Sequence, residues 1–99
     1  MRLTQDQIAA IRQAVSESFG AGAEVWLFGS RVDDSKRGGD IDLLIRPDPA
    51  VTDQLLLRKI RLLGRLERTL GERKIDVVVE HPADSRPIVQ VAHETGIRL

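Results

Sequence analysis

The sequence GSRVDDSKRGGDID occupies residues 29–42: a Gly-Ser turn, a polar loop, and two aspartates, Asp40 and Asp42, separated by one isoleucine. Apolar segments lie on both sides of the loop, so the stretch joins two expected β-strands. Side chains at positions i and i+2 of a strand share one face, about 6 to 7 Å apart. The two carboxylates are therefore expected to point together, while Ile41 points to the opposite face and the core.

The rest of the chain shows clear helix and strand patterns. Thr4 and Gln7 have the spacing of a capping box, which predicts the start of an amphipathic helix. Gly71 follows a second helical pattern and is expected to end it. The expected elements are helices over residues 4–20, 52–70 (with Thr52 as its cap) and 85–93, strands over 24–28, 40–45 and 74–80, and a short edge strand over 97–99. The third strand is nearly continuous in Ile and Val, which predicts burial on both faces.

Connection lengths predict how these strands pair. Residues 29–39 are too few for a parallel crossover, so the first two strands should run antiparallel. A full helix separates the second and third strands, which predicts a right-handed parallel crossover. The expected fold is α/β (α+β): one domain over residues 1–99, with a small mixed sheet flanked by helices. Asp76, near the start of the third strand, should then lie level with Asp40 and Asp42.

Three carboxylates at one place suggest a metal site. Neighbouring carboxylates repel one another unless a cation lies between them. Mg²⁺ prefers oxygen ligands and is often completed by substrate phosphates. Asp40 and Asp42 are therefore candidate Mg²⁺ ligands, and Asp76 either binds a second ion or takes a proton from an attacking group.

The Gly-Ser turn is a candidate phosphate cradle. Gly29 lets the backbone approach a phosphate closely, and the Ser30 hydroxyl adds a donor. Lys36, Arg37 or Arg31 could supply counter-charges to a nucleoside triphosphate. Together with paired metal ions, this layout favours attack of a hydroxyl on an α-phosphorus, with pyrophosphate leaving.

The composition limits the class of protein. The chain has 99 residues, 41% apolar and 30% charged, which is typical of one globular domain. The sequence shows neither a targeting segment nor an apolar run long enough for a membrane span. The absence of cysteine suits a cytoplasmic protein.

Acidic and basic residues balance, so direct binding to nucleic acid is not indicated. The basic stripe over residues 58–74 is either a solvated helix face or a binding patch.

Gly29-Ser30-Arg31, followed by Asp40-Ile41-Asp42-Leu43 and later by Asp76, resembles the minimal nucleotidyltransferase (MNT) group of the DNA polymerase β-like nucleotidyltransferases. The motifs cover roughly residues 25–79, and the element order is similar over almost the whole chain. The resemblance implies the nucleotidyltransferase fold, ATP as substrate and two Mg²⁺ ions. It implies that Gly29 and Ser30 bind the triphosphate, and that the metal ions are bound by Asp40, Asp42 and Asp76.

The chain departs from that group in two respects. Many relatives carry a basic residue and a glycine soon after the Gly-Ser-Arg motif, where this chain has Asp33 and Asp34. Lys36 and Arg37 follow in the same loop and are candidates to replace the missing positive charge. Larger relatives add a helical domain that holds an acceptor. Small stand-alone members are similar to this chain in lacking that domain, and many of them act as antitoxins that pair with a helical HEPN-type toxin and adenylylate it.

Three functions are therefore carried forward. The first is an enzyme that places AMP on a hydroxyl of a partner protein, as the antitoxin of a HEPN/MNT pair. The second is a catalytically idle module that neutralises its partner by occlusion. The third is a nucleotidyltransferase acting on a small molecule such as an antibiotic. An apolar rim on so small a domain would also favour association with a copy or a partner.

Overall fold

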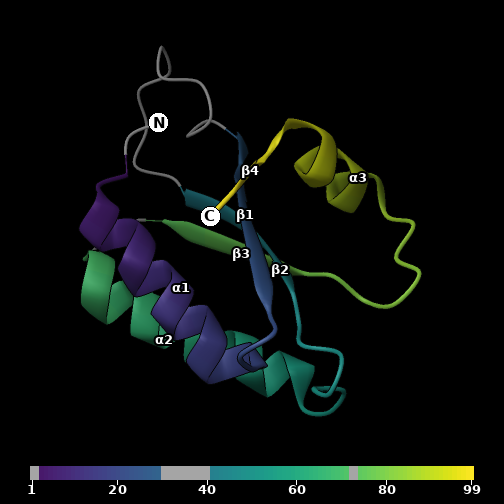
Figure 1. The fold of residues 1–99 in the computed structure, drawn as a ribbon, viewed down its shortest axis with the longest axis horizontal. Coiled ribbons are helices and arrows are strands. Elements are labelled where there is room, and N and C mark those ends of the chain that lie inside the picture. The colour runs from purple at the N-terminus through teal and green to yellow at the C-terminus, as the bar shows by residue number, and fades with distance from the viewer. Residues whose placement is uncertain (1–2, 30–40, 72–73) are drawn as a thin grey trace.

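The computed structural model describes residues 3–29, 41–71 and 74–99. Its elements are three helices, α1 (Gln5–Phe19), α2 (Leu55–Leu70) and α3 (Pro87–Thr95), and four strands, β1 (Glu24–Phe28), β2 (Ile41–Arg46), β3 (Ile75–Val79) and β4 (Ile97–Arg98). The strands form one sheet in the order β3-β2-β1-β4 (Figure 1). β1 runs antiparallel to β2 and β4, and β2 runs parallel to β3. The predicted mixed sheet and its strand directions are confirmed.

Local signals explain where the helices begin and end. Thr4 caps α1 through the predicted box: its hydroxyl accepts from the amide of Gln7, whose side chain accepts from the amide of Thr4. Gly71 ends α2, as expected. The predicted cap of α2 at Thr52 was wrong, because the cap is Gln54 in a left-handed conformation. α3 begins with Pro87 in its first turn, where a missing amide proton costs no hydrogen bond.

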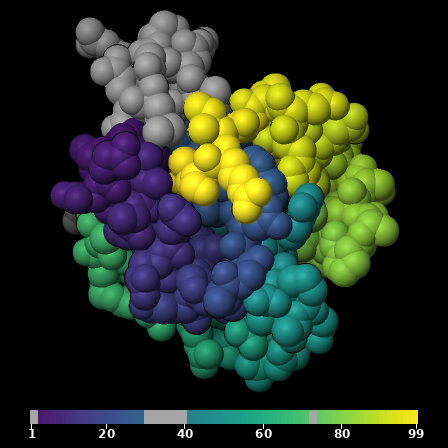
Figure 2. Space-filling view, viewed as in Figure 1, coloured from purple at the N-terminus to yellow at the C-terminus, as the bar shows by residue number. Residues whose placement is uncertain are grey.

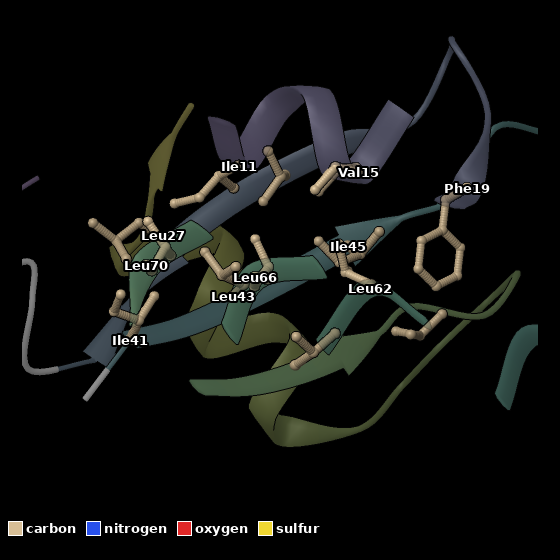
Figure 3. Close-up of a cluster of buried hydrophobic side chains, with 14 of the residues drawn as sticks. Ile11, Val15, Phe19, Leu27, Ile41, Leu43, Ile45, Leu62, Leu66 and Leu70 are labelled. Atoms are coloured by element: carbon tan, nitrogen blue, oxygen red, sulfur yellow. The ribbon is translucent and has the colours of Figure 1, made fainter. Parts of the chain in front are cut away.

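The sheet separates two apolar clusters. On one face α1 and α2 pack against alternate residues of the strands, and Figure 3 shows this larger core, with Phe19 and Leu66 among its fully buried side chains. On the other face α3 contributes Val89 and Ala92, which pack on Phe28 and Leu44. β2 is buried on both faces because helices cover both sides of it.

β3 differs from its sequence prediction. It was expected to be buried on both faces, but it is the edge strand of the described sheet and Asp76 is exposed. Its Ile and Val residues fill the core on the α2 side, where Val77 and Val79 are buried, while Val78 is only half-buried under α3. The run of apolar residues therefore belongs to an edge strand that is buried mainly on one face.

The C-terminus returns to the centre of the molecule. β4 pairs with β1 at the second edge of the sheet, and the amide of Leu99 donates to the carbonyl of Val25 at 3.0 Å. Figure 2 shows this C-terminal segment between α1 and α3. Among the described residues, no helix has both the length and the apolar character that crossing a bilayer requires.

Candidate functional site

A row of side chains crosses the end of the sheet at which β1 stops and β2 and β3 start. Phe28 of β1 lies opposite Asp42 of β2, which in turn lies opposite Asp76 of β3. Residues paired directly across neighbouring strands point to the same face. Asp42 is half-buried and Asp76 is exposed, so both carboxylates share one face at the rim of the sheet. The antiparallel and parallel connections produce this meeting, as the topology predicted.

The turn after β1 lies directly against this row. Gly29 has a φ of +79°, a left-handed backbone conformation that L side chains rarely adopt. A Cβ atom at this position would lie 2.1 Å from Oδ2 of Asp42. The turn therefore needs glycine for two reasons, its backbone conformation and its contact with the Asp42 carboxylate. The close approach that the structure shows is that of the Asp42 carboxylate to the Gly29 backbone.

Several predicted site residues fall outside the described part of the structure. They are Ser30, Arg31, Lys36, Arg37 and Asp40. Within residues 3–29, 41–71 and 74–99, no three His, Cys, Asp or Glu side chains gather in a possible metal cluster. The structure thus brings together Gly29, Asp42 and Asp76, and the roles of all eight predicted residues stay predictions.

The chemistry of Asp42 and Asp76 fits a hard divalent cation. The donors are carboxylate oxygens on adjacent strands, which is the ligand type that Mg²⁺ takes from proteins. Two like charges in direct cross-strand register repel each other, and a cation bound between them would relieve that repulsion. Solvent reaches Asp76, so substrate oxygens could complete the coordination.

Beyond Asp42 and Asp76, the same face becomes apolar and then charged. The next row is Trp26, Leu44 and Val78, which α3 covers. The row after that holds Arg46 of β2, whose Nε donates to Oε2 of Glu80 at 2.8 Å. His93 of α3 contacts the other oxygen of Glu80, and its ring meets that of Trp26 edge-on at 4.5 Å between centroids.

The charged groups of Arg46, Glu80 and His93 interact with one another and hold α3 against the sheet. Burial raises the pKa of Glu80, but hydrogen bonds from His93 and Arg46 outweigh it and hold that pKa below its usual range. The Arg46 guanidinium also lies 5.1 Å from the Trp26 ring centroid. These contacts give the Trp26 and His93 side chains a packing role between the sheet and α3. No local sequence pattern predicts the Glu80 network, because its members are distant along the chain.

A mixed sheet that holds paired carboxylates beside a glycine turn fits a class of enzymes that handle phosphates with divalent cations. The family model described as Nucleotidyltransferase domain matches residues 8–99. The chain therefore belongs to the nucleotidyltransferase domain family, and its general chemistry is nucleotidyl transfer. Members of this family generally use a nucleoside triphosphate and a divalent metal ion. No curated protein matches the sequence.

Proposed function

We propose that this chain transfers AMP from ATP to a hydroxyl group of a partner protein in a Mg²⁺-dependent reaction. The observation that carries the proposal is the direct register of Asp42 and Asp76 beside the close-approach glycine at position 29. Carboxylates on two strands and a backbone able to reach phosphate are the parts that such a transfer needs.

The residues divide the work as follows. Gly29 and Ser30 hold the β- and γ-phosphates, with Lys36, Arg37 or Arg31 as counter-charges, and Asp40, Asp42 and Asp76 hold the metal ions. Magnesium, when bound there, would neutralise charge on the entering and leaving oxygens.

The reaction makes one bond and breaks one. The acceptor oxygen bonds to the α-phosphorus, and the bond from that phosphorus to the oxygen bridging to the β-phosphate breaks. Pyrophosphate leaves, AMP stays on the acceptor, and the hydroxyl proton passes to the Asp76 carboxylate.

The biological setting that we propose is an antitoxin paired with a HEPN-type toxin in the cytoplasm. Its support is the motif resemblance together with exposed apolar side chains, since Leu56 is 71% and Ile60 57% exposed on α2. Apolar groups left on the surface of a small domain are typical of a protein that associates with another chain. The proposed unit is one domain over residues 1–99 that works in a hetero-oligomer or homo-oligomer.

The test uses the complex with the protein of the adjacent reading frame. The complex is incubated with Mg²⁺ and each labelled nucleoside triphosphate, and intact mass spectrometry follows the partner. We expect a gain of one AMP from ATP and a loss of about 100-fold or more in rate for Asp42→Asn. The control is Asp53→Asn, an exposed aspartate before α2, which should keep the wild-type rate. No gain with any nucleotide would exclude this activity.

The exposed apolar residues also favour the second candidate, neutralisation by occlusion. Asp40→Asn separates the two functions in a toxin-neutralisation assay. Neutralisation that is lost while the complex persists supports catalysis, whereas undiminished neutralisation supports occlusion.

A further inference from the structure

β3 is an edge strand of the described sheet, and its outer edge lies beside the candidate site. The amide of Ile41 donates to the carbonyl of Lys74 at 2.9 Å, and the amide of Glu80 donates to the carbonyl of Ile45 at 2.8 Å. In a parallel ladder, alternate residues of each strand bond to the partner. Asp76 and Val78 therefore direct their backbone groups to β2, whereas Ile75 and Val77 direct theirs away from the described sheet.

One part of this edge is already closed by a side chain. Nη2 of Arg86 donates to the carbonyl of Val79 at 2.7 Å. Asp84 holds that guanidinium through two short contacts, and its own carboxylate is only 4% exposed. The Arg86 hydrogen bond, with that from the backbone amide of His81, keeps the pKa of Asp84 well below its usual range, so the pair stays charged. Arg86 thus covers the outer edge at Val79, and no strand among the described residues pairs with this edge nearer Asp76.

A hollow of about 250 Å³ lies on the α2 side of the same edge. Its lining includes Leu55, Leu56, Lys59, Val77, Val79 and His81. The floor is apolar, Lys59 and Arg86 supply positive charge, and no carboxylate is among the described lining residues. An apolar side chain beside an acidic one would complement this surface.

We propose that the outer edge of β3 binds an extended segment of the acceptor protein as an added strand and so brings its hydroxyl to Asp76. This inference rests on the proposed function, whose acceptor is a protein hydroxyl. Backbone bonds to Ile75 and Val77 provide affinity, and the pleat provides specificity. A residue directly opposite Asp76 has its Cβ about 4.5 to 5.5 Å away and points to the same face. A Ser or Thr there is within reach of the carboxylate that accepts its proton.

The alternation of the strand defines the chemistry of the bound segment. The hydroxyl residue faces the side of Asp42 and Asp76, where an acidic residue would be repelled. Its immediate neighbours face the α2 side, where apolar residues enter the hollow and an acidic residue meets Lys59. The acceptor is therefore an extended segment that alternates hydroxyl residues with apolar and acidic ones.

The probe is a synthetic peptide with that pattern, acetyl-TETVSVTET-amide, used up to about 1 mM with the full chain. Hydrogen exchange by NMR reads out strand addition. We expect the amides of Ile75 and Val77 to exchange at least about tenfold more slowly with peptide bound. The amides of Asp76 and Val78 already bond to β2 and serve as internal references. With ATP and Mg²⁺ the serine peptide should gain AMP, and the same peptide with alanine for the central serine should not.

A charge-reversal pair tests the hollow. Lys59→Glu should weaken peptide binding about three- to tenfold. Arg61→Glu makes the same change two residues along the helix, on its other side, and should stay within about twofold.

Three results would count against the proposal. They are unchanged exchange at Ile75 and Val77, equal effects of the two variants, or protection without peptide that grows with protein concentration, which would assign the edge to a second copy. Two further outcomes distinguish failure of this docking mode from failure of the proposed function. Edge protection without AMP transfer would count against the proposed function alone, and AMP transfer to the peptide without edge protection would overturn this docking mode alone.

Discussion

At the scale of single residues, Gly29 is the position where backbone conformation and site chemistry meet. We predict that Gly29→Ala loses about 2 kcal/mol of stability or more, from a left-handed backbone and from a Cβ placed 2.1 Å from Oδ2 of Asp42. The displaced carboxylate should also lower the rate of nucleotide transfer. Urea denaturation and the mass-gain assay measure the two effects.

Gly71 supplies a matched control for this change. Its φ is +82°, close to that of Gly29, but a Cβ there would meet no atom of the described residues within 4 Å. Gly71→Ala should therefore show the backbone cost alone, about 1 kcal/mol, and full activity. If the two variants lost equal stability and both stayed active, the contact between Gly29 and Asp42 would have no role in the site.

Residue types and topology were enough to predict that Asp42 and Asp76 meet. The prediction worked because connection length restricts strand direction and the pleat restricts the face. The sequence could not show that the Cβ position of Gly29 is taken by the Asp42 carboxylate. That contact depends on the exact path of the turn, which no local pattern encodes.

At the scale of elements, α3 is tied to the sheet by Glu80, which His93 of α3 and Arg46 of β2 both contact. The pKa of Glu80 is lowered in the fold, so its contribution is fully present above its unfolded pKa of about 4.3 and is lost as pH falls through the folded value. We predict that Glu80→Gln costs about 1 kcal/mol at pH 7. Its difference from wild type should shrink steadily as the pH drops below about 5.

Urea titrations followed by circular dichroism across this pH range test that prediction. Glu67→Gln, an exposed position on α2, makes the same chemical change outside the network and should stay near wild type at every pH. A Glu80→Gln deficit of constant size from pH 7 to pH 3 would show that the carboxylate contributes by shape alone.

Element boundaries show where sequence patterns stopped being informative. Thr52 has a good capping side chain, yet α2 begins after Gln54. Gln54 has a left-handed φ of +53°, so the helix does not extend back through it to Thr52. Tertiary contacts decide this, because Arg58 binds both the Asp53 backbone carbonyl and the carbonyl of Ser18 in α1. Likewise, the apolar run of β3 does not show from sequence alone that β3 is an edge strand of the described sheet.

At the scale of the whole molecule, the candidate site lowers the stability of the fold, because it places two carboxylates side by side. α2 carries the chain across one face of the sheet so that β3 lies beside β2, and this crossover sets Asp76 against Asp42. The two clusters on either side of the sheet hold the strands in this register despite the like charges. Removing one charge should therefore help the metal-free fold and harm the function, a trade-off common at active sites.

Asp76→Asn tests this trade-off directly. In metal-free, low-salt buffer we expect it to gain about 0.5 kcal/mol of stability, because a cross-strand repulsion is removed. Adding Mg²⁺ with a non-hydrolysable ATP analogue should raise the Tm of the wild type, since a ligand bound only by the folded state stabilises it by mass action. The same additions should shift Asp76→Asn much less, while Asp53→Asn, whose carboxylate pairs with Arg58, should gain no stability and should keep the wild-type Mg²⁺-induced shift. Equal Mg²⁺-induced shifts in all three proteins would mean that the cation binds elsewhere, and a metal-free loss of stability in Asp76→Asn would mean that the paired carboxylates support the fold.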